Sequence, residues 1–142
     1  MTDRIAPDDS VIVTSTRSVK RARSLRQRLD ALVRKRVWGM DIHPSAWIAA
    51  SAYIDRTWPR GIHIGENCVI DEEASVLTHD MTRGIYFDTR IGSDTVIGVR
   101  AIIMPGITIG AGSVIEPGAV VTRDLPEGSR VRGNPARQVE DD

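Results

Sequence analysis

The sequence predicts an all-β fold, a parallel β-helix of about four coils, with an α-helix before it. Three observations in the 142-residue chain lead to this fold class. Isoleucine or valine recurs every six residues between Ile42 and Val121, and a small residue stands two positions before most of them. Only two insertions interrupt the repeat, and both fall at the same point of the cycle.

The six-residue period determines which side chains point inward. Side chains alternate along a strand, so each repeat residue and the small residue two positions earlier face one side, and the residue between them faces the other. Six residues thus form one face of a triangular prism, and eighteen form one coil. All twelve repeat positions are isoleucine or valine: Ile42, Ile48, Ile54, Ile64, Ile70, Val76, Ile91, Ile97, Ile103, Ile109, Ile115 and Val121.

The two insertions have a predictable place on this prism. Four extra residues separate Ile54 from Ile64, and nine separate Val76 from Ile91. Each insertion follows the third repeat of a coil, so both loops should leave the same corner. A random loss of register has no reason to select one corner twice.

The outward strand residues form columns of different polarity. One column is polar: Asp41, His63, Arg90 and Thr108. Another is apolar: Trp47, Val69, Val96 and Val114. An apolar column on an exterior surface calls for cover by the N-terminal helix or by another subunit, and we favour a subunit interface.

The chain divides at residue 39. Residues 1–38 are expected to form a polar tail, with a short strand at Val11–Val13, and then a helix from about Ser18 to Val37 that ends at Gly39. Nine of the 19 basic residues lie between Arg17 and Arg36, against one acidic residue there. Such a basic amphipathic helix fits a solvated face, docking on the prism or another subunit, or contact with anionic lipid. Residues 39–142 are expected to form the β-helix domain and a C-terminal tail.

Composition excludes several classes of protein. The single cysteine, Cys68, permits no internal disulfide and no cysteine-based zinc site. The sequence shows no membrane-spanning run and no secretory leader, so we expect a cytoplasmic protein. No motif supports nucleic-acid binding. The Gly110-Ala-Gly112 segment lacks the third glycine and the strand–helix unit of a dinucleotide-binding loop.

Four stretches carry a resemblance to a known family: residues 61–70, 76–80, 91–126 and 133–137. Together they resemble the hexapeptide-repeat acyltransferases, in particular sugar O-acetyltransferases and serine acetyltransferases. The resemblance covers about residues 42–137 and implies a left-handed β-helix, an exception to the usual right-handed crossover. It also implies a homotrimer.

The same resemblance implies acetyl-coenzyme A as the acyl donor, bound in a groove between neighbouring β-helices. The family's residues near the adenine and phosphates match Thr122 and Arg123, and a basic residue after the last turn matches Arg137. The positions along the pantetheine arm match Gly98, Val99 and Pro117. Val99 and Pro117 replace the more usual serine and alanine, so backbone contacts are expected there.

His79 is the candidate catalytic base. It lies where the longer insertion leaves the prism, in a Thr-His-Asp context that resembles enzymes modifying polysaccharide and lipopolysaccharide precursors. A thioester is already activated, so the reaction mainly requires a base for the acceptor and a site for the oxyanion. Histidine titrates near neutrality and suits the first task. Either Asp80 or a backbone carbonyl is expected to orient the ring.

Aromatic residues in the two insertions are candidate acceptor contacts. Trp58 lies in the shorter insertion, and Tyr86 and Phe87 lie in the longer one. If these rings meet, they either floor a sugar-binding pocket or only anchor the loops. His63, on the polar column, is a surface histidine or an acceptor contact.

A zinc site is the other chemistry that three histidines suggest. A zinc carbonic anhydrase of this fold needs three converging imidazoles. The family pattern has two histidines five residues apart on one coil, and this sequence has no such pair. His43, which precedes Pro44, is expected to be structural. We therefore predict no metal.

The predicted function is transfer of an acetyl group to a sugar hydroxyl in the synthesis of a surface polysaccharide or lipopolysaccharide precursor. The acceptor is a small or a lipid-linked sugar. Two alternatives remain at this stage. One is acetylation of an amine or of serine, and the other is a non-catalytic β-helix scaffold.

Overall fold

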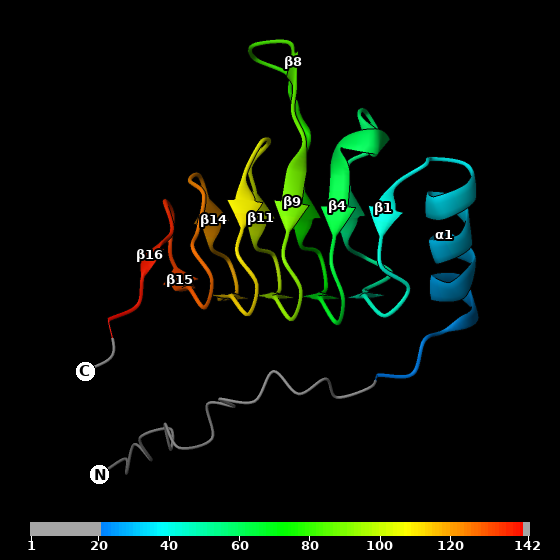
Figure 1. Ribbon diagram of the computed structural model, residues 1–142, viewed down its shortest axis with the longest axis horizontal. Coiled ribbons are helices and arrows are strands. Elements are labelled where there is room, and N and C mark those ends of the chain that lie inside the picture. Colours follow the sequence, from blue (N-terminus) through cyan, green and yellow to red (C-terminus); the bar gives the residue numbers. More distant parts are fainter. Residues whose placement is uncertain (1–20, 141–142) are drawn as a thin grey trace, which may run out of the picture.

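The computed structural model describes residues 21–140. Its strands stack side by side into a column, with the helix α1 at one end and β16 at the other (Figure 1). The strand predicted at Val11–Val13, and the part of the predicted helix before residue 21, lie outside the described residues.

Three sheets form the walls of the column, and the chain visits them in turn. The first sheet contains β1 (Asp41–Ile42), β4 (Ile62–Ile64), β9 (Thr89–Ile91) and β12 (Thr108–Ile109). The second contains β2 (Trp47–Ile48), β5 (Val69–Ile70), β10 (Val96–Ile97), β13 (Val114–Ile115), β15 (Arg130–Arg132) and β16 (Arg137–Gln138). The third contains β3 (Tyr53–Ile54), β6 (Ser75–Val76), β11 (Ile102–Ile103) and β14 (Val120–Val121). All neighbouring strands in these sheets are parallel except β15 and β16.

The strand registers confirm the predicted period. Repeat residues of successive coils pair directly, as Ile42 does with Ile64 and Ile97 with Ile115. The predicted polar column is also aligned, because Asp41 pairs with His63 and His63 with Arg90. Beyond Val121 the column continues, because β15 pairs with β13 and buries Val131 completely.

Aliphatic side chains fill the interior. The repeat isoleucines are nearly all buried, and the small residues two positions earlier, such as Ala74, Ala101 and Ala119, have no exposed surface. β-Branched residues suit these strands, and the small residues fit where the walls converge. Cys68 is part of this core, and burial raises the pKa of its thiol.

Close stacking of the coils explains the glycine that often follows the repeat residue. A Cβ atom on Gly110 would lie 2.3 Å from the backbone nitrogen of Glu127 in the next coil. The spacing of about 4.8 Å between neighbouring strands leaves no room for it. Glycine at this corner is therefore a packing requirement.

The helix is shorter than the sequence suggested. α1 spans Leu25–Arg36, and residues 21–24 are not helical. It begins late because Ser24 forms a capping box with Gln27: the Ser24 hydroxyl accepts from the Gln27 N–H at 3.2 Å, and the Ser24 N–H donates to the Gln27 side chain at 2.9 Å. Gly39, with φ of +68°, turns the chain into β1.

α1 and the residue before its cap cover the end of the column. The Gln27 side chain donates to the carbonyl of Ile48 at 2.9 Å, and the Arg23 guanidinium donates to the carbonyl of Ala46 at 2.6 Å. β2 is an edge strand, and these contacts satisfy acceptors at its open edge. Among residues 21–140, no helix has the length and apolar character needed to cross a bilayer.

Candidate active site

Both insertions leave the column at one corner, between the third and first sheets, as predicted. The shorter one contains a single 3₁₀ turn, η2 (Pro59–Gly61). The longer one forms an antiparallel hairpin of β7 (His79–Asp80) and β8 (Ile85–Tyr86), which projects from the column (Figure 1). We call this region the loop corner.

His79 is half-buried on the hairpin, with one ring face covered by Tyr86. The two rings stack with centroids 4.6 Å apart and an interplanar angle of 23°. Trp58, from the other insertion, lies 5.8 Å from Tyr86 at an angle of 55°. Aromatic rings from both insertions therefore meet beside the candidate base.

Phe87 has a different place. Gly106 lies against its ring, because a Cβ atom there would be 3.1 Å from the Phe87 ring carbon Cγ. The Phe87 N–H also donates to the carbonyl of Thr78 at 2.8 Å. Phe87 thus anchors the base of the hairpin against Gly106, whereas the rings of Trp58 and Tyr86 lie close to His79. All three rings are partly exposed.

Asp55 is a residue of this corner that the sequence reasoning missed. Its side chain is only 3% exposed, and Oδ2 accepts from the backbone N–H groups of Thr78 at 3.0 Å and His79 at 3.2 Å. Oδ1 accepts from the N–H of Thr57 at 2.9 Å. A carboxylate directly before the first insertion was the available signal.

These contacts keep Asp55 charged. Burial alone would raise its pKa, but the hydrogen bonds from the backbone of Thr78, Thr57 and His79 outweigh burial and hold the pKa below its ordinary value. The negative charge lies beside the peptide that carries the His79 imidazole. Asp55 therefore fixes the backbone at the candidate base.

Asp80 has its own partners in the hairpin turn. Oδ1 accepts from the N–H groups of Thr82 at 2.9 Å and Arg83 at 3.2 Å, and Oδ2 lies 3.1 Å from the Arg83 Nε. These bonds close the turn between β7 and β8. The placement of His79 that the structure shows comes instead from stacking on Tyr86 and from the Asp55 contacts to the backbone.

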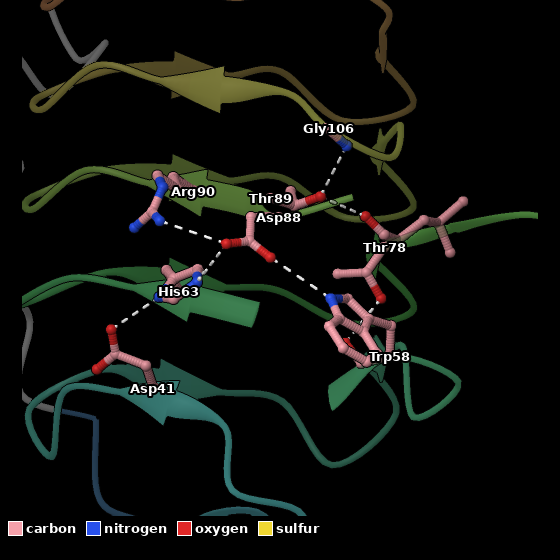
Figure 2. Close-up of polar contacts among 9 residues, drawn as sticks. Asp41, Trp58, His63, Thr78, Asp88, Thr89, Arg90 and Gly106 are labelled. Carbon is pink, nitrogen blue, oxygen red and sulfur yellow. Dashed lines mark hydrogen bonds and ion pairs between the residues drawn. The ribbon is translucent and has the colours of Figure 1, made fainter. Parts of the chain in front are cut away.

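His63 lies between two carboxylates on the outer face of the first sheet (Figure 2). Its Nδ1 is 2.8 Å from Asp41 Oδ2, and its Nε2 is 3.5 Å from Asp88 Oδ2. Asp88 also receives the Trp58 indole N–H at 3.4 Å and pairs with Arg90 at 3.4 Å. Asp88, which the sequence reasoning did not select, therefore joins the polar column to the ring of Trp58.

Two buried threonines form hydrogen bonds at the points where the insertions leave and rejoin the column (Figure 2). The Thr78 hydroxyl donates to the carbonyl of Trp58 at 3.1 Å, which links the two insertions. The Thr89 hydroxyl donates to the carbonyl of Leu77 at 2.6 Å and accepts from the N–H of Gly106 at 3.0 Å. The loop corner is thus tied to the column through satisfied hydrogen bonds.

The residues matched to the cofactor site fall into two groups. Thr122, Arg123 and Arg137 line one pocket at the C-terminal end of the column. Thr122 follows β14 at the loop corner, two strand spacings or roughly 10 Å along the column from the point where His79 leaves it.

The second group lies at another corner, between the second and third sheets: Gly98, Val99 and Pro117. Gly98 is buried, and a Cβ atom there would lie 2.7 Å from the nitrogen of Pro117. Val99 is 37% exposed. Within one chain, the third sheet separates this group from His79.

Several charged side chains of the described chain form ion pairs, such as Arg100 with Glu73 and both Arg130 and Arg132 with Glu116. Among residues 21–140, no three histidine, cysteine, aspartate or glutamate side chains are grouped as a metal ion would require. His43 is part of a turn, where its Nδ1 lies 2.7 Å from the Ser45 hydroxyl.

Known families match two parts of the repeat region. The bacterial transferase hexapeptide family (six repeats) matches residues 88–123, and the hexapeptide repeat of succinyl-transferase matches residues 49–71. These parts of the chain therefore have the sequence repeats of the hexapeptide-repeat transferases. Both matches lie on the walls and corners described above, and the first includes the strands β9 to β14.

A similar curated protein is serine acetyltransferase 4 of Arabidopsis thaliana, which is 35% identical over 108 residues, 72% of this chain and 30% of the relative. Serine acetyltransferase of Bacillus subtilis is 34% identical over 117 residues, 79% of this chain and 53% of the relative. This hexapeptide-repeat chain therefore spans no more than about half the length of these relatives.

A solved structure of similar fold is a hexapeptide-repeat acetyltransferase from Vibrio cholerae, with a TM-score of 0.63 and 22% identity; the match covers 83% of this chain and 82% of that one. A galactoside acetyltransferase in complex with coenzyme A has a TM-score of 0.61 and 23% identity, over 85% and 74% of the two chains. At this identity, both matches show the fold.

Proposed function

We propose that this hexapeptide-repeat protein is an acetyl-coenzyme-A-dependent O-acetyltransferase with His79 as its base and a sugar hydroxyl as its acceptor. The observation that carries the proposal is the position of His79 at the loop corner. Its imidazole stacks on Tyr86, beside Trp58, on a hairpin that Asp55 and the buried threonines hold in place. Acetyltransferases among the relatives and fold neighbours support the reaction class.

The chemistry requires only one proton carrier. The neutral imidazole of His79 takes the proton of the acceptor hydroxyl while that oxygen attacks the thioester carbonyl. The tetrahedral intermediate then collapses, the carbon–sulfur bond breaks, and the imidazolium returns the proton to the sulfur. A histidine is suited to both transfers near neutral pH.

We propose that acetyl-coenzyme A binds between two copies of the chain in a homotrimer of left-handed β-helices. Thr122, Arg123 and Arg137 would hold the adenine and phosphates, and Gly98, Val99 and Pro117 would line the pantetheine arm. The placement of these groups at different corners supports a site shared by neighbouring chains. Coenzyme A complexes of fold neighbours support this donor.

The acceptor side of the proposal rests on the aromatic surface. Trp58 and Tyr86 would face the apolar side of a sugar ring, and His63 and Asp88 would contact its hydroxyl groups. Asp80 would act only through the hairpin turn that it closes. The acceptor is a free or lipid-linked sugar in surface polysaccharide or lipopolysaccharide precursor synthesis, and the enzyme works in the cytoplasm.

Serine is the second candidate acceptor. The curated serine acetyltransferases that match this chain at 34–35% identity favour it. An aromatic floor for a sugar ring favours the first candidate, because serine offers no apolar face of comparable area.

Release of free thiol from acetyl-coenzyme A tests the proposal. The purified protein is assayed without an acceptor, with nucleotide sugars and simple sugars, and with serine, each alongside the His79→Ala variant. We expect sugar-dependent release that the variant loses. Release only with serine would select the second candidate, and the absence of release with every acceptor would contradict acetyl transfer in favour of a non-catalytic scaffold.

A further inference from the structure

α1 presents a polar side to the column and leucines to the outside. Leu25, Leu29 and Leu32 recur at intervals of four and three residues, so they share one face of the helix. Their exposed fractions are 81%, 61% and 53%. Gln27, which bonds the β2 edge, lies on the opposite face. A surface helix usually buries its apolar stripe against the core, whereas α1 turns its leucines away from the column.

Basic side chains border these leucines. Arg26, Arg28, Lys35 and Arg36 are all exposed. The only acidic residue of the helix, Asp30, is half-buried, and its carboxylate lies 4.0 Å from Arg26 Nε. Arg26 lies on one border of the leucine face, Arg28 and Lys35 lie on the other, and Arg36 ends that face. The outward side of α1 is therefore apolar over the turns that carry the leucines and cationic along its borders and at its C-terminal end.

The position of α1 in the molecule limits which partner can bind the outward side of the helix. The helix lies across the end of the column, beyond β1 (Figure 1). The apolar column of Trp47, Val69, Val96 and Val114 lies on the flank, on the outer face of the second sheet. A copy packed side by side on that flank leaves the end of the column uncovered. A second α1 facing the first would place like charges against each other.

We propose that the outward side of α1 binds an anionic lipid surface. Leu25, Leu29 and Leu32 enter the boundary between headgroups and acyl chains, while the basic residues contact lipid phosphates. Leucines bordered by lysine and arginine are the pattern of helices that lie in a membrane interface. The inference is independent of the acetyl-transfer proposal, because it uses none of the residues of the loop corner.

Vesicle flotation of the full chain tests the inference. Vesicles of phosphatidylcholine alone are compared with vesicles that also contain phosphatidylglycerol, and we expect binding to the second kind only. Combining Leu25→Gln, Leu29→Gln and Leu32→Gln should lower binding at least about 10-fold, because the inserted apolar surface is lost. Glutamine has a helix propensity close to that of leucine, and circular dichroism checks that α1 persists.

A charge variant with a matched control sharpens the test. Arg28→Gln with Lys35→Gln should weaken binding to the anionic vesicles about 30-fold, at roughly one kcal/mol per basic residue. Arg60→Gln with Arg132→Gln removes the same charge from exposed positions elsewhere and should leave binding unchanged.

Three outcomes would overturn the inference: equal binding to both kinds of vesicle, no binding of the unmodified chain, or full binding of the leucine variant. A smaller assembly of the leucine variant in light scattering would assign the face to a second copy instead. Thiol release by the leucine variant in solution is measured in parallel, so a failure of membrane binding is distinguishable from a failure of acetyl transfer.

Discussion

The walls of the column and the loop corner use the same backbone architecture for different purposes. In the walls, buried isoleucine and valine repeat in register, and each coil supports the next through parallel strand pairing. At the loop corner the six-residue period is interrupted, and buried polar side chains hold the backbone in place. The carboxylate of Asp55 and the hydroxyls of Thr78 and Thr89 form hydrogen bonds with the backbone of the insertions. Stability thus resides in the repeats, and the proposed acetyl transfer depends on the residues that interrupt them.

His79→Ala should have the largest effect on turnover, and it should show most clearly that the loop corner can be changed without a loss of stability in the walls. We expect turnover to fall by about 10²–10⁴-fold, because the acceptor loses its base. Thermal unfolding should stay close to that of the unmodified protein, because the imidazole lies on a projecting hairpin. His43→Ala, which removes a histidine from a turn outside the loop corner, is the control and should retain turnover.

Ile97→Ala should lower the stability of the protein and leave turnover nearly unchanged, the reverse of His79→Ala. Ile97 has no exposed surface, and truncating a buried isoleucine typically costs about 2–5 kcal/mol of the free energy of unfolding. Denaturant unfolding measures this loss, while turnover per folded molecule should stay nearly unchanged. Val37→Ala, at a position 71% exposed, should change stability by less than about 0.5 kcal/mol. Similar losses for both variants would contradict the assignment of stability to the walls.

Asp55→Asn should affect both properties. The amide keeps the shape of the side chain but supplies one oxygen for N–H groups that now bond both carboxylate oxygens. Leaving a buried N–H without an acceptor costs about 1–3 kcal/mol, and turnover should fall as the backbone at His79 loosens. Unfolding and steady-state kinetics on the same preparation measure the two effects.

The pH dependence of that stability difference has a definite sign. The pKa of Asp55 is lower in the folded protein than in the unfolded chain, where it is about 4. The ionised carboxylate therefore makes its full contribution to the free energy of unfolding above the unfolded-state pKa. That contribution declines as the pH falls through the folded-state pKa. The gap between Asp55→Asn and the unmodified protein should therefore be widest near neutrality and narrow in acid. A gap that widens in acid would refute this role.

Trp58→Ala should have the smallest effect. We take the contact between Trp58 and the sugar to be comparable to that of two aromatic rings, about 0.5–1.5 kcal/mol, so the KM for the acceptor should rise about 2- to 13-fold. Trp58→Phe should restore most of this loss, and the KM for acetyl-coenzyme A should not change. An equal rise in both KM values would indicate a general disturbance of the loop corner.

Sequence reasoning succeeded wherever a period was present. The repeat from Ile42 to Val121 gave the register, the inward residues and the corner shared by both insertions, because each depends only on counting residues in a fixed geometry. The late start of α1 was also readable, since Ser24 and Gln27 have the spacing of a capping box. The longer apolar pattern concealed it.

The contacts of the loop corner were not readable in the same way. The stacking of His79 on Tyr86 depends on a hairpin whose turn lies inside a non-repeating insertion. The hydrogen bonds that Asp55 accepts from Thr78 and His79 join residues 23 and 24 positions apart, and Asp55 stands where other coils have an ordinary corner residue. Their identification required the folded coordinates, because no local propensity specifies which backbone groups a carboxylate will reach.

The two ends of the column have a consequence for how these molecules behave in concentrated solution. A stack of parallel strands with bare ends is a template on which further molecules add, end upon end, into a fibre. Here side chains of Arg23 and Gln27 occupy acceptors at one terminal edge, and at the other β16 reverses direction against β15. The contacts of Arg23 and Gln27 and the antiparallel strand β16 thus complete the fold and also prevent end-to-end polymerisation.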